Sequence, residues 1–288
     1  MKGLTVRQKR ILAVSACVLL AFAVAGIVYV FHDDENINEI VKTDGGMTVA
    51  VTPTLDCLPL YVAQANGIAE DMGCPLALQE HMSIADCDSA LTGGSAVCAT
   101  TDCVRAEMFL ADKKKTSGKQ FLLLQNPNRW LYLFANRKAR IRKASQMKDK
   151  MIAVDRKGAD ALMAQYVLDS VKLADDKAFL VNINSISTRM AMLANNTMDA
   201  AVLPEPIATV ARKAGHESLY AEHGRDGKVY GAFLVKDGMK DMFVKVYNRA
   251  CDSINKNGVH HYDSILIRRM AVPGKYVKDI PARRFVKL

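Results

Sequence analysis

Apolar runs of strand length alternate with segments of helical spacing along this sequence, and the alternation occurs twice. The runs that we interpret as buried strands lie at residues 47–51, 75–79, 95–99 and 121–124 in the first half and at 151–154, 179–183 and 200–203 in the second. Parallel strands need long crossover connections, usually helices, so this alternation indicates βαβ units. Two such sets predict an α/β protein with two similar lobes, each a mainly parallel sheet flanked by helices.

Polar residues between predicted strands and helices mark where several helices should begin. Asp56, Ser83 and Asp102 each precede a segment of helical spacing. Ser, Thr, Asp and Asn side chains in this position accept hydrogen bonds from the free N–H groups of the first helical turn. We therefore expect these three residues to cap helices.

A proline between asparagines follows the fourth apolar run, in Gln125-Asn126-Pro127-Asn128. Turn-forming residues after a core strand are typical of a crossing between lobes. A further strand-like run, residues 230–235, precedes a helical segment and is interpreted as the return of the chain to the first lobe. The expected division is a leader at 1–31, a linker at 32–46, the first part of lobe I at 47–126, lobe II at 127–229, and the return to lobe I with a C-terminal tail at 230–288.

Residues 11–31 carry no charged side chain and are together long enough to cross a bilayer core as a helix. Basic residues precede this stretch and acidic residues follow it, so the rest of the chain should lie outside the cytoplasm. Three fates stay open: retention as a membrane anchor, cleavage at the Ala-x-Ala pattern of residues 23–25, and lipidation at Cys17. All three place the globular part at the periplasmic or extracellular face of the cytoplasmic membrane.

The formal net charge of +9 does not indicate a nucleic-acid-binding protein. The basic residues are scattered, and few aromatic residues are interleaved with them to stack on bases. We expect no nucleic-acid partner.

Six cysteines follow the leader, at positions 57, 74, 87, 98, 103 and 251. Their even number in an oxidising compartment suggests disulfides, whereas their apolar neighbours suit buried free thiols, and both interpretations stay open. No Cys or His spacing matches a closed tetrahedral zinc site, so no metal is expected. The sequence also lacks GxxxxGK, GxSxG and HExxH motifs, and we predict neither a cofactor nor a catalytic residue.

Four segments together resemble a known family. They are Thr52-Pro53-Thr54-Leu55-Asp56-Cys57-Leu58-Pro59-Leu60-Tyr61-Val62-Ala63 with Asn66-Gly67, Ser89-Ala90-Leu91-Thr92-Gly93-Gly94-Ser95 through Asp102, Met147-Lys148-Asp149-Lys150-Met151-Ile152-Ala153, and Met198-Asp199-Ala200-Ala201-Val202-Leu203-Pro204-Glu205-Pro206. In order and spacing they are similar to the substrate-binding proteins of nitrate, sulfonate, taurine and thiamine-pyrimidine importers. The resemblance implies the type II periplasmic-binding fold, a small-molecule ligand, and the permease and ATPase subunits of an ABC importer as partners. We expect the binding protein itself to be a monomer.

Ligands of open α/β sheets bind outside the carboxyl ends of the strands, where helix N-termini offer free N–H groups. That rule selects as candidate ligand-binding residues Thr54, Asp56, Thr100, Thr101, Asp102, Lys157, Gly158 and Glu205. Trp130, just past the predicted crossing, could stack on a ligand ring. Each has a structural alternative: Asp56 and Asp102 as helix caps, Glu205 as part of a turn between two prolines, and Trp130 as core packing.

Three carboxylates at candidate cleft loops would oppose an anion unless Lys157 and Arg129 dominate, so the sequence favours an amine-bearing or aminopyrimidine-like ligand. Two alternatives to a transport role stay open. The same fold hosts dehydratases and a thiamine-pyrimidine synthase, although those enzymes are cytoplasmic. A membrane-tethered solute sensor would need the same cleft and no transporter.

Overall fold

The computed structural model describes residues 46–116, 118–173, 177–223 and 228–288. The predicted leader, its three possible fates and all but the last residue of the predicted linker lie outside these ranges. Within them, no helix is both long and apolar enough to cross a membrane.

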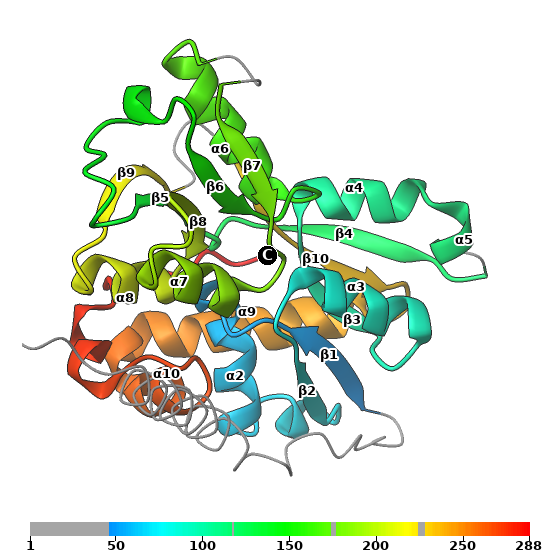
Figure 1. Ribbon diagram of the computed structural model, residues 1–288. Helices are drawn as coiled ribbons and strands as arrows, with labels where there is room; N and C mark the ends of the chain where they lie inside the picture. Colours follow the sequence, from blue (N-terminus) through cyan, green and yellow to red (C-terminus); the bar gives the residue numbers. More distant parts are fainter. Residues whose placement is uncertain (1–45, 117, 174–176, 224–227) are drawn as a thin grey trace, which may run out of the picture. The chain divides into compact units, whose positions relative to one another are not determined.

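The first lobe is built on a sheet with the strand order β2-β1-β3-β10-β4. Its strands are β1 (Met47–Val51), β2 (Leu76–Glu80), β3 (Cys98–Asp102), β4 (Phe121–Asn126) and β10 (Gly231–Lys236). Strand β1 pairs in parallel with β2 and β3, whereas β10 is antiparallel to β3 and β4. The carboxyl ends of β1 and β3 therefore meet at one edge, the edge that faces the second lobe (Figure 1).

The second lobe repeats this arrangement with the strand order β7-β6-β8-β5-β9. Its strands are β5 (Leu131–Ala135), β6 (Met151–Val154), β7 (Phe179–Asn182), β8 (Ala200–Pro204) and β9 (Glu217–Glu222). Strand β6 is parallel to β7 and β8, and β5 is antiparallel to β8 and β9. The predicted α/β fold with two similar lobes is confirmed.

The helices flank both sheets (Figure 1). They are α2 (Leu58–Ala65), α3 (Ile84–Gly93), α4 (Cys103–Ala111), α5 (Lys113–Thr116), α6 (Ala159–Ser170), α7 (Ile186–Ala194), α8 (Ile207–Lys213), α9 (Lys240–Asn257) and α10 (Asp263–Arg268). Short 3-10 turns are η1 (Leu55–Cys57), η2 (Glu70–Met72), η3 (Ala144–Gln146), η5 (Val259–Tyr262) and η6 (Gly274–Asp279).

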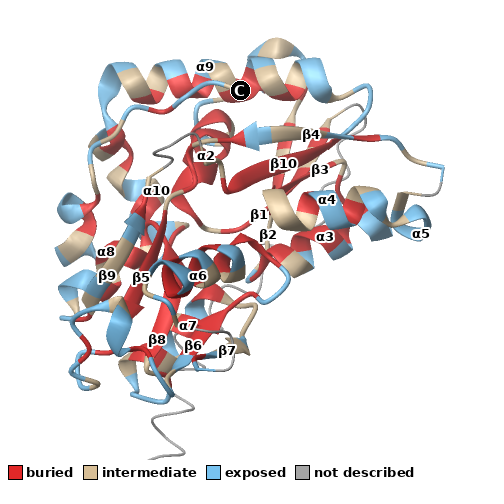
Figure 2. Cartoon of the chain, turned by 90° about the horizontal axis from the view of Figure 1, so that it is seen from above, coloured by how far each residue is buried: buried red, intermediate tan, exposed pale blue. Residues whose placement is uncertain are grey.

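The central strands of each sheet are buried on both faces (Figure 2), which explains why β1, β8 and β10 consist largely of apolar residues. In β1, Val49 and Val51 pack into the core formed with α2 and α9, while Ala50 packs into the core formed with α3 and α4. The second lobe has the same two layers, with α6 on one face and α7 and α8 on the other.

Strand β3 lies three residues later than the apolar run suggested. Its pairing with β10 continues to Asp102, which is opposite Gly231. Thr100 and Thr101 are therefore strand residues and not the predicted turn. Ladder hydrogen bonds from β10, more than a hundred positions away in sequence, decide this boundary.

All six cysteines outside the leader are free thiols, and five of them are buried. Of the two interpretations left open by the sequence, the buried thiol is the one that the structure contains. Within the described ranges, no group of three or more His, Cys, Asp or Glu side chains is placed to hold a metal ion.

The chain passes from β4 to β5 through residues 127–130, and this crossing is attached to the C-terminal tail. Asn128 accepts a hydrogen bond from the Val286 N–H at 2.9 Å and donates one to the Val286 carbonyl at 2.8 Å. Asn255 and Asn248 bind backbone groups of Phe285 and Leu288 in the same way. The tail, which carried no interpretable sequence pattern, is thus part of the first lobe.

Ser83 caps α3 as predicted, with its hydroxyl accepting the Asp86 N–H at 3.2 Å. Replacing Ser83 with Ala should lower the free energy of unfolding by about 1 kcal/mol, because a free N–H of the first turn loses its partner. Denaturant titration of the Ser83→Ala and Ser89→Ala variants measures the difference. Ser89 lies exposed on the same helix, so an equal loss in both variants would contradict the capping role.

Candidate functional site between the two lobes

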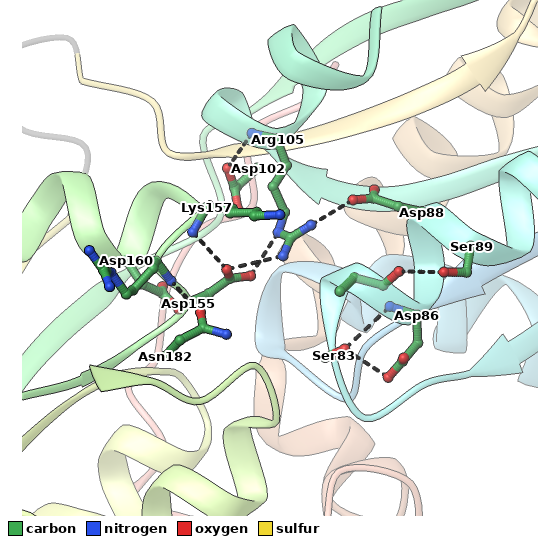
Figure 3. A network of polar contacts seen from close by, with 12 residues as sticks. Ser83, Asp86, Asp88, Ser89, Asp102, Arg105, Asp155, Lys157, Asp160 and Asn182 are labelled. Carbon is green, nitrogen blue, oxygen red and sulfur yellow. Dashed lines mark hydrogen bonds and ion pairs between the residues drawn. The ribbon is translucent and has the colours of Figure 1, made fainter. Parts of the chain in front are cut away.

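The two lobes are joined at the strand ends by the side chain of Arg105. This residue lies in the first turn of α4, and its Nε and Nη2 atoms donate to the two carboxylate oxygens of Asp155 at 2.7 and 3.0 Å (Figure 3). Asp155 directly follows β6 of the second lobe, and its side chain is 4% exposed. The Nη1 atom of Arg105 donates to Asp88 of α3 at 2.9 Å. One guanidinium therefore holds a carboxylate from each lobe.

Two further contacts bring the lobes together without intervening space. The Leu55 N–H donates to the Glu205 carbonyl oxygen at 2.8 Å. Asp102 approaches Gly158 so closely that a Cβ atom on Gly158 would lie 2.6 Å from the Asp102 Oδ2 atom. The two lobes are therefore in direct contact at these points.

Asp56 forms a buried ion pair with Arg129. The Nε atom of Arg129 lies 3.2 Å from Asp56 Oδ2, and the two side chains are 3% and 1% exposed. Asn126 donates to the same carboxylate oxygen at 3.3 Å. The prediction that Asp56 caps the first helix was wrong, because α2 begins at Leu58 without a side-chain cap. The carboxylate instead contacts the Arg129 guanidinium, a charged donor that offsets the unfavourable desolvation of a buried acid.

Asp102 caps α4 as predicted, accepting the Arg105 N–H at 2.9 Å. Its side chain is buried, and burial raises its pKa from 3.8 to about 7, helped by the nearby negative charge of Asp160 and opposed by the hydrogen bond from Arg105 and the charge of Arg129. Asp102 thus lines the lobe interface and caps a helix at the same time.

The three predicted threonines are all fully buried at the strand ends. The Thr54 hydroxyl lies 3.1 Å from that of Thr52 and 3.5 Å from an Arg129 nitrogen. The hydroxyls of Thr100 and Thr101 are buried and have no hydrogen-bond partner among the residues that the structure describes. Asp56 and Thr54 form one polar cluster with Arg129, and the Asp102 carboxyl is near enough for its charge to act on that guanidinium.

Glu205 and Trp130 lie beside that cluster, with partners of their own. Glu205 is buried and accepts hydrogen bonds from the Thr209 N–H and hydroxyl at 3.0 and 2.8 Å. Burial raises the pKa of this carboxyl. Trp130 stacks on His223 with 4.4 Å between ring centroids, and the Arg283 guanidinium covers the ring at 3.8 Å.

Lys157 lines a cavity of about 320 Å³ at the rim of the lobe interface. The cavity is lined by Ala85, Asp88, Ser89, Thr92, Arg105, Met108, Phe109, Lys115, Lys157, Asn182 and Asn184. These residues come from α3, α4 and α5 of the first lobe and from the end of β7 and two loops of the second. We call this space the rim cavity.

Sequence reasoning missed Arg105, Asp155 and Asp88. Asp155 follows a predicted strand directly and satisfies the strand-end rule as well as Lys157 does, so that rule could have found it. Arg105 and Asp88 lie within helices, and no local pattern distinguishes them from solvent-exposed charges.

No protein-family model and no curated protein matches this sequence. Solved structures do match. The alkanesulfonate-binding protein of Xanthomonas axonopodis pv. citri, bound to MOPS, aligns with a TM-score of 0.68 at 14% identity, over 82% of this chain and 83% of that one. The fold is that of the periplasmic binding proteins.

Two further solved structures show the same likeness. The nitrate-binding protein of Synechocystis PCC 6803 aligns with a TM-score of 0.70 at 13% identity, over 82% of this chain and 69% of that one. The ligand-binding component of an ABC-type import system from Staphylococcus aureus aligns with a TM-score of 0.65 at 15% identity, over 84% and 85%. The resemblance to sulfonate- and nitrate-binding proteins that the sequence segments indicated is confirmed at the level of the fold.

Replacing Arg129 with Met should lower the free energy of unfolding by about 3–5 kcal/mol, because Asp56 then remains buried without its countercharge. The double variant Asp56→Asn/Arg129→Met should recover most of that loss, since no lone charge is left. Urea unfolding of the wild type, both single variants and the double variant measures the coupling. Additive losses would show that the pair is not coupled.

The raised pKa of Asp102 predicts a pH-dependent stability. Between pH 4 and pH 7 the unfolded chain has this carboxyl ionised while the folded protein keeps it protonated, so its contribution falls as pH rises, by up to about 1.4 kcal/mol per pH unit, and levels off above pH 7. Asp102→Asn retains the cap and removes this titration. The wild-type minus variant difference in unfolding free energy should therefore decline across that window, and a flat difference would contradict the assignment.

Proposed function

We propose that this protein is an extracytoplasmic solute-binding protein that holds a small polar solute between its two lobes and presents it to an ABC importer. The observation that carries the proposal is the joining of the lobes at the carboxyl ends of their strands, where Arg105 binds Asp155 and Leu55 binds Glu205. Two domains that meet through polar groups at this edge have the geometry for closing on a solute.

The likeness to binding components of importers supports this role, and a transporter distinguishes such a protein by its open and closed forms. The crossing at residues 127–130 and the return into β10 would absorb the rotation. The partners would be a permease and an ATPase, with residues 11–31 as the membrane tether and the receptor itself a monomer. We expect binding without turnover, because the buried charges at the strand ends are committed to one another.

The proposed solute is small and amine-bearing, and an aminopyrimidine is one candidate. Two of the carboxylates at the strand ends have basic partners: Asp56 is paired with Arg129, and Glu205 lies 3.6 Å from Arg212. Support for a donor-bearing solute now comes from acceptors left without partners: one oxygen of Asp88 and the side-chain oxygen of Asn184, both in residues that line the rim cavity.

A thermal-shift screen of the full-length chain with nitrate, taurine and 4-aminopyrimidine tests the proposal. A solute at a hundred times its dissociation constant should stabilise the folded state by about 2.7 kcal/mol. Absence of stabilisation by these and a wider panel of small polar solutes would contradict a solute-binding role. Stabilisation by nitrate alone would keep the role and overturn the amine-bearing class.

Closure itself can be tested at Gly158. In Gly158→Ala the new methyl group would overlap Asp102 across the interface, so the closed form should lose population and solute affinity should fall by about tenfold or more. Distances between spin labels attached to exposed positions of the two lobes report the closed population. Gly93→Ala is the control, because nothing lies within 4 Å of a Cβ atom there; equal behaviour of both variants would contradict closure at this contact.

A further inference from the structure

Arg129 fills the place at the strand ends where the polar groups converge. Its guanidinium lies against Asp56 and Thr54, it is 4% exposed, and the charges of Asp102 and Asp160 act on it. A charged side chain of the protein thus already occupies this place and satisfies the acid there. A solute at this position would have to displace Arg129 and leave Asp56 buried without a partner, which is costly.

The rim cavity, in contrast, is open and contains groups without partners. Lys115 and Lys157 line it, both are exposed, and neither ammonium group is in an ion pair with a described residue. One carboxylate oxygen of Asp88 and the side-chain oxygen of Asn184 are buried without a hydrogen-bond partner among the described residues. A buried acceptor without a donor is unfavourable, so these two oxygens indicate an absent donor.

We propose that the solute of this protein is a small amino-group-bearing anion held in the rim cavity, with its anionic end toward Lys115 and Lys157 and its amino group toward Asp88 and Asn184. The proposal rests on the proposed solute-binding function and assigns its site and ligand class. Each lobe supplies one lysine and one acceptor: Lys115 and Asp88 from the first, Lys157 and Asn184 from the second. A ligand that binds all four therefore binds only the closed form.

Arg105 prepares this site without binding the solute. All three of its guanidinium nitrogens are engaged by Asp88 and Asp155 (Figure 3), which fixes the Asp88 carboxylate, and the other Asp88 oxygen has no hydrogen-bond partner among the described residues. Burial raises the pKa of Asp88 to about 6 although Arg105 lowers it, so Asp88 is mainly ionised at neutral pH. The cavity volume of about 320 Å³ lies at the small end of the range usual for small-molecule sites, which suits a compact ligand.

Three probes of similar size separate the two ends of the site. β-Alanine carries a carboxylate and an ammonium group, propionate only the carboxylate, and propylamine only the ammonium group. Calorimetric titration of the full-length chain should give an affinity for β-alanine about tenfold or more above that for either single-ended probe, because each charged hydrogen bond contributes at least about 1.4 kcal/mol. Equal affinities for all three probes, or none for β-alanine, would overturn the proposed ligand class.

Two variants and one control locate the site. Lys115→Ala should weaken β-alanine binding about tenfold, whereas Lys114→Ala, its exposed neighbour on α5 outside the cavity, should leave binding unchanged. Asp88→Asn should remove the preference for β-alanine over propionate. Unchanged β-alanine binding in Lys115→Ala and Asp88→Asn would overturn the rim cavity as the site while the solute-binding function stands. That function fails separately, if the wider solute panel stabilises nothing.

Discussion

Charge can be buried between two lobes only if each charged group finds a partner, and this constraint determines how the interface is built. Asp56 of the first lobe is paired with Arg129 of the crossing between the lobes. Asp155 of the second lobe is paired with Arg105 of the first. The first pair attaches the crossing to the first lobe, and the second holds the two lobes together beside the rim cavity. Arg105 of the second pair lines the open rim cavity. The positions of the two arginines therefore determine where a solute has room to bind.

These pairs also explain why a likeness in fold says little about the ligand. Identities of 12% to 16% to the solved structures leave almost every side chain at the strand ends free to differ. The fold guarantees that loops from both lobes converge at one edge. Single residues, here Arg129 and Arg105, determine which part of that edge is filled by side chains of the protein and which part stays open.

Most of the strands, Ser83 and Asp102 were predictable from sequence because their signals are local: apolar runs that are buried in the sheets, and short polar side chains at helix starts. Strands β5 and β9 were not predicted. Asp56 has the same local signal and behaves differently, because its partner is 73 positions away. Arg105 and Asp155 are 50 positions apart, and nothing near either residue predicts their contact. Sequence reasoning thus selected residues at the edge where the lobes meet and missed the long-range pairs that decide which part of that edge is open.

The position of β10 has a consequence for how the protein is made. This strand lies between β3 and β4 in the first sheet, yet it is synthesised after every strand of the second. The second lobe can therefore complete its sheet while β3 and β4 still have unpaired edges. Such edges invite pairing with other chains, so the interval before β10 emerges is when a nascent chain most needs protection from aggregation.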